Sequence, residues 1–527
     1  MADFDVVIVG GGHNGLVCSA YLAEAGLKVS VLERRPVIGG AAVTEELWPG
    51  FHLSVASYWM SLLQPKIMLD LELRRYGVKV LETAPGFQPF SNGTSIVFWP
   101  ETKRMCEELA KFSPADAEAY PRYVAHMEAL VVELRKLLFE IPVDPTTGKA
   151  SDILKALSFA WRFRKIGVRF YDLWDLLTLS AYDYLKRWFS SPEVLTIFGC
   201  YASGSGGNIG PKSPGSAYVL SRPFLRDPNT AAGPGGLVEG GMGSITQALK
   251  RCAVDRGVVV RENAEVERVI VENGTAKGVR LVGGETVKAR AVVSNTASKV
   301  LFHRLLDRNV VPDEVYDAVN RIRTDSSCFK INLATKALPQ WTALQQRGIS
   351  TPPGSITIAE NLEELQRAFE AAGHGEMAQR PYMWILTPSA VDRSAAPEGM
   401  HTVSILGGHV PYRLKEGTWD DAAHDRLFDI VMSQIERYAP GFRENVLHRQ
   451  VLAPPDIERI FALPGGHVHH GELSLDQVFF RRPIAHYADY RTPIKNLFQC
   501  GASTHPGGGV TGVPGHNAAK IIVAAMK

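Results

Sequence analysis

Residues 4–15 read FDVVIVGGGHNG, and this stretch decides the fold. The continuous apolar run over residues 4–9 is typical of a strand that is buried on both faces of a parallel sheet. Helical spacing of apolar residues then extends from Leu16 to Ala25, and Gly26 is suited to end that helix. Residues 28–32 (KVSVL) predict the next strand. We therefore expect the chain to open with a βαβ unit of an α/β fold.

The glycines between the first strand and the helix match the pattern G-x-G-x-x-G at Gly10, Gly12 and Gly15. In this pattern the first glycine makes a tight turn, the second lets a pyrophosphate approach the backbone, and the third lets helix and strand pack closely. The N–H groups at the start of the helix, near His13 and Asn14, would face the phosphate charge. The pattern therefore predicts a dinucleotide site.

An acidic residue stands where such a site needs one. Glu33 ends the second predicted strand, 18 residues after Gly15, where a carboxylate can accept both hydroxyls of an adenosine ribose. Arg34 and Arg35 follow, and this basic pair would suit a 2′-phosphate. The negative charge of Glu33 would repel such a phosphate, so we do not expect one.

The residues after Glu33 favour FAD over NAD as the cofactor. Gly39, Gly40 and Ala41 complete a Glu-x5-Gly-Gly extension, in which the chain resembles the glutathione-reductase-like flavoproteins. In those proteins the second glycine pair continues along the FAD. A terminal NAD site does not need this extension, so we expect the dinucleotide to be FAD.

A second glycine pattern occupies the C-terminal stretch. Gly507, Gly509 and Gly512 again match G-x-G-x-x-G, but only one predicted helix follows before Lys527. We expect this loop and the start of its helix to close over the flavin end of the same cofactor. Since no second complete nucleotide fold is evident in the sequence, oxygen or a quinone is expected to reoxidise the flavin in place of NAD(P)H.

The remaining patterns predict two interleaved domains. A largely helical pattern runs from about 50 to 235, short strands return over 257–295 with a hairpin signal at Asn273–Gly274, and 422–438 forms an amphipathic helix. We expect an FAD-binding domain and a substrate domain whose helical part near 150–190 faces a membrane. Their predicted boundaries are 1–85, 235–300 and 486–527 for the first, and 86–234 and 301–485 for the second.

Three longer motifs stand at 10–42, 233–249 (GPGGLVEGGMGSITQAL) and 496–519 (NLFQCGASTHPGGGVTGVPGHNAA). They resemble those of the phytoene-desaturase-like flavoproteins, part of the amine-oxidase-like superfamily. Residues 436–442 (ERYAPGF) and 470–483 (HGELSLDQVFFRRP) look closest to its non-carotenoid branch, the pyridine-nucleotide-disulfide-oxidoreductase-domain proteins. The resemblance spans essentially the whole chain. It implies a glutathione-reductase-like Rossmann FAD-binding domain, interleaved with an α+β substrate domain in which helices cover a mixed sheet.

The same resemblance implies further contacts with the cofactor. The backbone of Val266 would pair with adenine, while Gly501, Ala502, Gly512 and Val513 would line the isoalloxazine end. The chain departs from the wider flavoprotein pattern at one of these positions. Where a Gly-Asp pair is usual, Gly501 is followed by Ala502, so the carboxylate that would bond the ribityl chain is missing.

Three side chains are candidates for catalysis. His505 and His516 flank the C-terminal glycine loop, where either could orient a substrate or move a proton. Loop anchoring and helix capping are the structural alternatives for both. Glu239, within GGLVEGGMG, is a third candidate.

Two other features have simpler explanations. The HVHH run at 467–470 could suggest a metal, but flavin chemistry needs none and no carboxylate partner stands at a fixed spacing, so we predict no metal site. Cys500 precedes the flavin loop, where a buried thiol is favoured over covalent flavin attachment.

Composition limits the partners and the compartment. The formal net charge of +2 gives no global reason to expect nucleic acid. The six cysteines form no CxxC pair and are expected to be reduced thiols of a cytoplasmic protein. We expect no secretory signal at the N-terminus, and no run approaches the about 20 apolar residues of a spanning helix, so membrane contact would be peripheral.

One segment suggests such contact. Residues 155–189 combine ten aromatic with seven basic residues in a helical pattern, which suits a membrane interface or the mouth of an apolar tunnel. Core packing with solvated basic residues is the alternative.

Together these features predict an FAD-dependent oxidoreductase that removes hydride from a C–H or C–N bond to flavin N5. By family analogy the substrate is hydrophobic and polyene- or isoprenoid-like. An amine oxidase is the alternative enzyme. The non-enzymatic alternative is an escort protein like the GDP-dissociation inhibitors, which share the fold without FAD, but the intact glycines and Glu33 argue against it.

Overall fold

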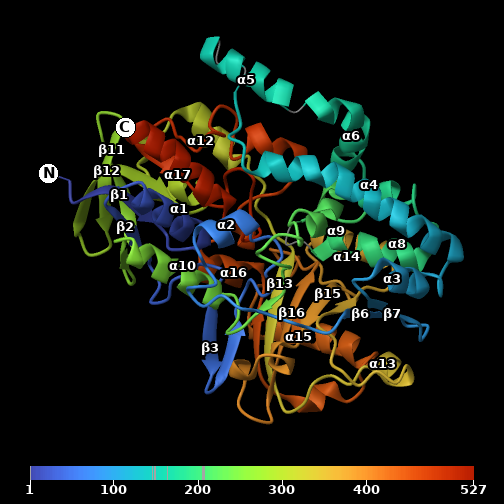
Figure 1. The fold of residues 1–527 in the computed structure, drawn as a ribbon. Helices are drawn as coiled ribbons and strands as arrows, with labels where there is room; N and C mark the ends of the chain where they lie inside the picture. The colour runs from blue at the N-terminus through green and yellow to red at the C-terminus, as the bar shows by residue number, and fades with distance from the viewer. Residues whose placement is uncertain (1, 145, 147–149, 163, 205–207) are drawn as a thin grey trace.

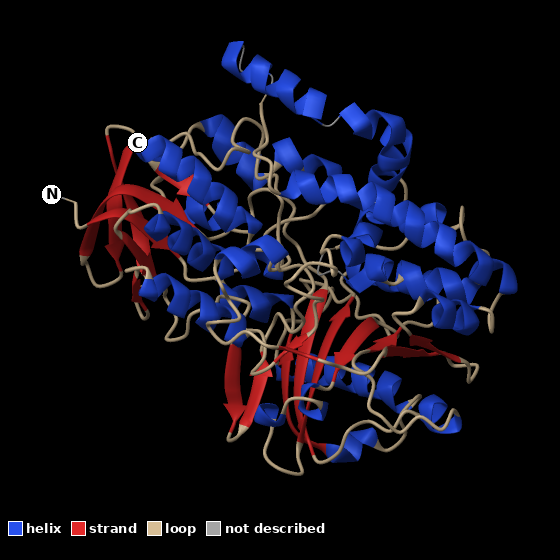
Figure 2. Cartoon of the chain, in the orientation of Figure 1, coloured by secondary structure: helices blue, strands red, loops and turns tan. Residues whose placement is uncertain are grey.

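Two sheets of seven strands each organise the molecule (Figures 1 and 2). The computed structural model of the chain describes residues 2–144, 146, 150–162, 164–204 and 208–527. Figure 2 shows the two groups of strands apart from each other, with helices packed around both. The α/β fold class predicted from the opening residues is confirmed.

The first sheet contains the predicted βαβ unit. Its central strand β1 pairs in parallel with β12 and β2, so that Val7 lies opposite Val292 on one side and Ser30 on the other. The predicted hairpin forms at Asn273–Gly274, where both residues have a positive φ. The sheet order is β10 (Val266–Glu272), β11 (Thr275–Leu281), β12 (Thr286–Ser294), β1 (Phe4–Val9), β2 (Val29–Leu32) and β9 (Val259–Arg261), and β18 (Leu497–Gln499) also pairs with β12.

The second sheet is mixed, and it shows that the range 50–235, which is largely helical as predicted, also contains short strands. Two of its strands, β6 and β7, lie within that range, and so do the short strands β4 (Phe51–Ser54, paired with β3, Thr44–Trp48) and β5 (Val80–Leu81, paired with β8, Leu237–Val238). Strands of two to four residues are too short to show a period of two in the sequence. The sheet order is β17 (Val446–Leu452), β13 (Cys328–Thr335), β16 (His401–Gly408), β15 (Tyr382–Leu386), β14 (Ile356–Ile358), β6 (Gly86–Pro89) and β7 (Ser95–Phe98).

Strands of the first sheet come from three separated stretches of the chain, and those of the second sheet from two. We propose that the two sheets mark the two interleaved domains, with the boundaries predicted above.

Helices cover both sheets (Figure 1). In the part of the chain that the structure describes, none of them is long and apolar enough to cross a membrane. In chain order they are α1 (His13–Glu24), α2 (Pro65–Asp70), α3 (Thr102–Leu109), α4 (Pro114–Leu138), α5 (Ala150–Arg162), α6 (Phe170–Thr178), α7 (Ala181–Leu185), α8 (Pro192–Gly199), α9 (Tyr201–Gly204), α10 (Gly243–Asp255), α11 (Ser298–Val300), α12 (Asp313–Asn320), α13 (Thr342–Gln346), α14 (Leu362–Gly373), α15 (Asp421–Glu436), α16 (Pro454–Phe461) and α17 (Val513–Met526).

The helix α1 begins three residues before the apolar spacing predicted. Its first turn consists of His13, Asn14 and Gly15, which belong to no apolar stripe. At the other end Gly26 has a φ of 86°, as its position after the helix requires. The early start matters because it brings the N–H groups of the first turn to the end of β1.

A glycine lets α17 lie close against α1. A Cβ placed on Gly515 would come within 2.2 Å of the backbone oxygen of Asn14. Only the hydrogen atom of glycine fits at this distance, so α17 packs directly against the first turn of α1, which contains the end of the glycine pattern.

We expect Gly515→Ala to lower the free energy of unfolding by about 1–3 kcal/mol, because the added methyl group overlaps a carbonyl that α1 holds in place. Urea unfolding of the FAD-loaded protein measures the change. Gly373→Ala is the matched control, since nothing lies within 4 Å of a Cβ at this last residue of α14. Equal stability of the two variants would contradict the close packing.

Candidate cofactor and substrate cavity

A cavity of about 690 Å³ lies where the two sheets face each other. On one side it is lined by residues at the carboxyl ends of β1 and β2, such as Val9 and Leu32. On the other side it is lined by residues of β14, β15 and β16, such as Trp384 and Leu406. A ligand in this cavity therefore touches both sheets.

The glycine stretch after β1 and the glycine pair after Glu33 lie side by side on the wall that β1 and β2 form. The N–H of Gly39 donates to the backbone oxygen of Gly11 over 3.0 Å, and Gly12 and Gly39 form a parallel bridge. A Cβ on Gly40 would lie 3.3 Å from the Cα of Gly12. The bare backbone thus forms a cradle that side chains would fill.

The start of α1 faces this cradle with polar groups that protein atoms do not satisfy. Its N-cap is Gly12, and no side chain among the described residues caps the helix there. His13 Nε2 and Asn14 Oδ1 are buried at the cavity wall without a hydrogen-bond partner in the described structure. Burial lowers the pKa of His13 to about 4, so the ring is neutral at pH 7. The uncapped N–H groups of the helix N-terminus and the His13 ring can donate to a pyrophosphate, whereas Asn14 Oδ1 can only accept.

Glu33 is held in place by two backbone donors. Its Oε2 accepts the N–H of Gly11 over 2.8 Å, and its Oε1 accepts the N–H of Arg35 over 3.0 Å. Each carboxylate oxygen has a second lone pair, so the group can still accept two ribose hydroxyls. Arg34 lines the same part of the cavity and donates to the backbone oxygen of Ile460.

Most predicted cofactor residues meet at the cavity. Those that line it are Gly10, Gly12, His13, Asn14, Glu33, Arg34, Gly39, Gly40, Ala41, Val266 and Ala502. The C-terminal loop also reaches the cavity, but through Gly509 and Val510.

Four predicted residues support the wall from behind. Gly15 and Gly501 allow close backbone packing, because a Cβ would lie 2.5 Å from Gly10 O in the first case and 2.7 Å from Asn295 O in the second. Gly512 is the left-handed N-cap of α17, and Val513, the first residue of that helix, is fully buried.

The two predicted catalytic histidines do not line the cavity. His505 Nε2 donates to the backbone oxygen of Leu137 over 2.9 Å. His516 Nδ1 lies 2.9 Å from Asn517 Oδ1, and its ring packs between those of Tyr21 and Phe139. Burial lowers the pKa of both histidines to about 4. These contacts anchor both side chains within the fold, which is the structural alternative to catalysis. We therefore assign neither histidine a role in catalysis.

Glu239 and Cys500 also lie away from the cavity. The Glu239 carboxylate is half-exposed and pairs with Lys79 Nζ at 2.8 Å. Cys500 is a fully buried thiol whose pKa is raised by burial and by the nearby Cys18. Neither side chain can reach a ligand in the cavity without a rearrangement of the fold.

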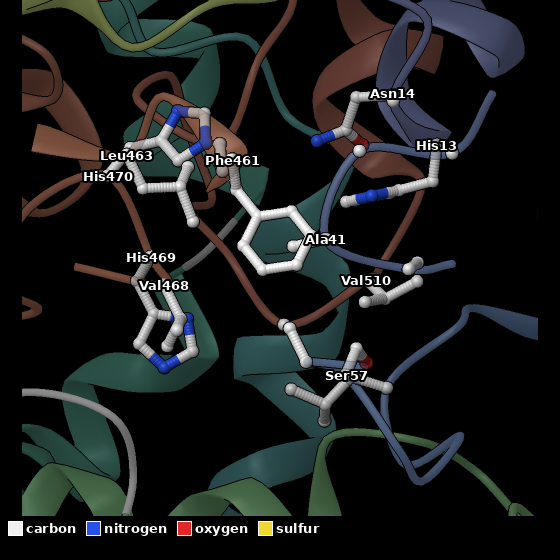
Figure 3. Close-up of a pocket in the computed structure, with 18 of the residues that line it drawn as sticks. His13, Asn14, Ala41, Ser57, Phe461, Leu463, Val468, His469, His470 and Val510 are labelled. Carbon is white, nitrogen blue, oxygen red and sulfur yellow. The ribbon is translucent and has the colours of Figure 1, made fainter. Parts of the chain in front are cut away.

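The HVHH run contributes to the cavity in a way that the sequence did not show. His467 Nε2 lies 3.3 Å from Glu472 Oε1 behind the wall. His469 and His470 line the cavity itself, opposite His13 (Figure 3). Burial lowers the pKa of His470 to about 3, so this ring is neutral as well.

Away from the glycine cradle the cavity has an aromatic end. Tyr58 and Trp59 both contact Trp384, with ring centroids 5.4 and 5.7 Å apart. We define the aromatic end by the cavity-lining side chains of Tyr58, Trp59, Phe98, Tyr201, Tyr382 and Trp384. Sequence reasoning missed all six, because they come from four segments that lie far apart in the sequence.

The 155–189 segment does not form this end. None of its described residues lines the cavity, so the predicted position at the mouth of a tunnel is not supported. The segment divides into a buried part, with Tyr184 and Phe189, and an exposed part that includes Trp161 and Tyr171. Phe163 lies outside the described residues.

These features can be compared with known proteins. The sequence matches the family of flavin containing amine oxidoreductases over residues 15–516. The chain belongs to this family. It is 38% identical over 547 residues to pyridine nucleotide-disulfide oxidoreductase domain-containing protein 2 of Mus musculus, which covers 100% of this chain and 94% of that protein.

Two further relatives agree with the family. A phytoene desaturase (lycopene-forming) of Pseudescherichia vulneris is 25% identical over 521 residues, with 96% of each protein covered. The crystal structure of an oxidoreductase from Methanosarcina mazei has the same fold, with a TM-score of 0.62 at 17% identity over 98% of this chain and 99% of that one. The resemblance predicted from the motifs is confirmed.

The family establishes an FAD-dependent oxidoreductase, and the escort-protein alternative is thereby set aside. The cavity fits the cofactor. The glycine cradle, the N–H groups of the first turn of α1 and the ring of His13 would hold the pyrophosphate, and Glu33 would hold the ribose.

We expect Glu33→Arg to weaken FAD binding by about 1–3 kcal/mol, since it replaces an acceptor by a cation and leaves buried polar groups unpaired. Titration of the apoprotein with FAD, followed by flavin fluorescence, measures the affinity. Glu82→Arg makes the same charge change at an exposed position and should bind FAD as the wild type does. An unchanged affinity in Glu33→Arg would place the ribose elsewhere.

Proposed function

We propose that this protein removes hydride from a C–H bond of a hydrophobic, polyene- or isoprenoid-like substrate. One observation carries the proposal: a single cavity joins the cradle for FAD to an aromatic end. Bound FAD would supply a two-electron acceptor for the hydride. The protein's own residues orient the substrate and keep water away.

The aromatic end supports an apolar substrate. Its rings offer large apolar faces, and the contacts of Tyr58 and Trp59 with Trp384 leave them little freedom. A flat, conjugated hydrocarbon chain gains free energy by leaving water for such a surface. Phe461, the last residue of α16, lines the cavity together with Leu463 and Val468 of the following segment, and these side chains exclude water beside the cradle (Figure 3).

The amine oxidase alternative has less support in the cavity. Of the described residues that line the cavity, the acids are Glu33 and Glu265. Glu33 belongs to the FAD cradle, and Glu265 pairs with Arg304 at 3.0 Å. A protonated amine at the aromatic end would find no counter-charge there. The name of the phytoene desaturase relative also favours a polyene.

Anaerobic mixing of the FAD-loaded protein with candidate substrates tests the proposal. An isoprenoid or polyene is expected to bleach the flavin absorption band, whereas benzylamine and putrescine should not. Bleaching by the amines alone would establish the amine oxidase instead. We propose that oxygen or a quinone then reoxidises the flavin, and addition of air or of a soluble quinone to the bleached sample should restore the band.

We further propose that residues 150–178, here the exposed arm, contact a membrane that contains anionic lipids. The arm comprises α5, the 3-10 helix η2 (Arg164–Arg169) and α6, and it extends from the body at the top of Figure 1. It carries five basic and three acidic residues. Apolar side chains are exposed beside these charges: Leu154, Leu157, Trp161, Phe170, Tyr171 and Trp174.

Such an arrangement suits the interface of a bilayer, where apolar bodies enter and basic tips stay at the headgroups. The Arg164 guanidinium lies 4.3 Å from the ring of Trp161, which shows this pairing. All six cysteines are free, which supports a cytoplasmic location with peripheral membrane contact.

Trp161→Glu is expected to reduce sedimentation with phosphatidylserine vesicles several-fold and to leave the spectrum of bound FAD unchanged. The matched control is Val282→Glu, because Val282 is 62% exposed and Trp161 is 68% exposed, and the control residue lies in the first sheet's hairpin region, away from the arm. Equal sedimentation of both variants, or loss of FAD in Trp161→Glu, would contradict membrane contact through the arm.

A further inference from the structure

An arginine lines the cavity between His469 and the C-terminal glycine loop. Arg222, in the 3-10 helix η3 (Ser216–Phe224), lines the cavity, and its Nη1 lies 3.1 Å from His469 Nε2. A guanidinium can only donate, so His469 accepts at Nε2 and its neutral ring carries the proton on Nδ1. The charge of Arg222 is therefore not cancelled by this contact.

The charge of Arg222 acts on one ring of the aromatic end, Tyr58. Burial raises the pKa of Tyr58 well above its usual value, and the charge of Arg222 acts against that rise. Burial also lowers the pKa of Arg222, but a guanidinium remains protonated at neutral pH. The cavity thus contains a fixed positive charge that acts on the aromatic end through Tyr58.

A second cation lies beneath the same wall. Lys330 Nζ lies 5.0 Å from the ring of Tyr58 and donates to Asn332 Oδ1 over 2.7 Å. Burial lowers the pKa of Lys330 to about 7, so a substantial part of these side chains is still charged at neutral pH. The acids among the described residues that line the cavity are Glu33, which belongs to the FAD cradle, and Glu265, which pairs with Arg304. The electrostatic potential there favours an anion.

We propose that the substrate carries a carboxylate at one end of its apolar body, and that Arg222 binds this carboxylate. The proposal rests on the proposed function and adds the head group of the substrate. The planar guanidinium can donate two parallel N–H bonds to a carboxylate, and aromatic faces beside it receive the hydrocarbon.

His469 acts as the positioning residue for Arg222. Its backbone oxygen accepts a 2.5 Å hydrogen bond from Arg482, a side chain that is 1% exposed and also donates to Ala502 O. The buried Arg482 side chain holds the loop that contains His469. This loop in turn holds the His469 ring, which accepts a hydrogen bond from Arg222. The guanidinium is thereby oriented before the substrate arrives.

Retinoate and retinol test the proposal, because they share one polyene chain and differ in the head group. Each is titrated into the FAD-loaded protein, and the perturbation of the flavin spectrum gives a dissociation constant. Retinoate is expected to bind about 10- to 100-fold more tightly than retinol, the range for a hydrogen bond to a charged group. Arg222→Met should remove this preference with retinol affinity unchanged, and Arg222→Lys should retain part of it.

Each other outcome has a definite meaning. If the wild type binds retinoate and retinol with equal affinity, the proposal of a substrate carboxylate is wrong and the proposed function is unaffected. This comparison uses the wild type alone, so it does not depend on whether a variant folds. Absence of binding by both, with no bleaching by any isoprenoid, overturns the proposed function as well. If Arg222→Met instead shifts the midpoint potential of the flavin and leaves retinoate affinity unchanged, Arg222 serves the cofactor and the proposal is wrong.

Discussion

The site depends on the close contact of two glycine-rich backbone stretches, which the carboxylate of Glu33 holds in place. Glu33 accepts N–H groups from Gly11 and from Arg35, and so ties the end of β2 to the loop after β1. Further along the chain, the N–H of Gly39 donates to the backbone oxygen of Gly11. Because this approach needs glycine, the first turn of α1 stays uncovered and its N–H groups face the cavity.

A buried arginine holds the opposite wall together. Arg482 is almost fully buried and donates five hydrogen bonds to the backbone oxygens of His469, Glu472, Gln477 and Ala502. Burial lowers its pKa to about 10, which still leaves it charged at neutral pH. A buried charge is tolerated when carbonyl dipoles surround it, and here they belong to two loops that both reach the cavity. The cofactor side and the substrate side are therefore joined by one side chain.

Nearness in the sequence misled the choice of catalytic residues. His505 stands two residues before Gly507, yet its ring turns to the end of α4 and bonds to Leu137. His516 lies in the first turn of α17, but its ring packs between Tyr21 and Phe139. No local pattern reveals that α1 and the end of α4 occupy the space beside these histidines. The contact of the HVHH run with Arg222 spans 247 residues of the chain, so the run by itself does not reveal it.

The sequence by itself determined the βαβ opening, the glycine cradle, Glu33 and the choice of FAD. These features depend on short-range spacing, since a strand, a turn and a helix start are each specified within a few residues. Only the tertiary structure decided the substrate side. Tyr58, Arg222, Trp384 and His469 come from four separate segments of the chain, and these segments must come together before the side chains share a cavity. Their contacts are long-range, so no spacing along the chain encodes them.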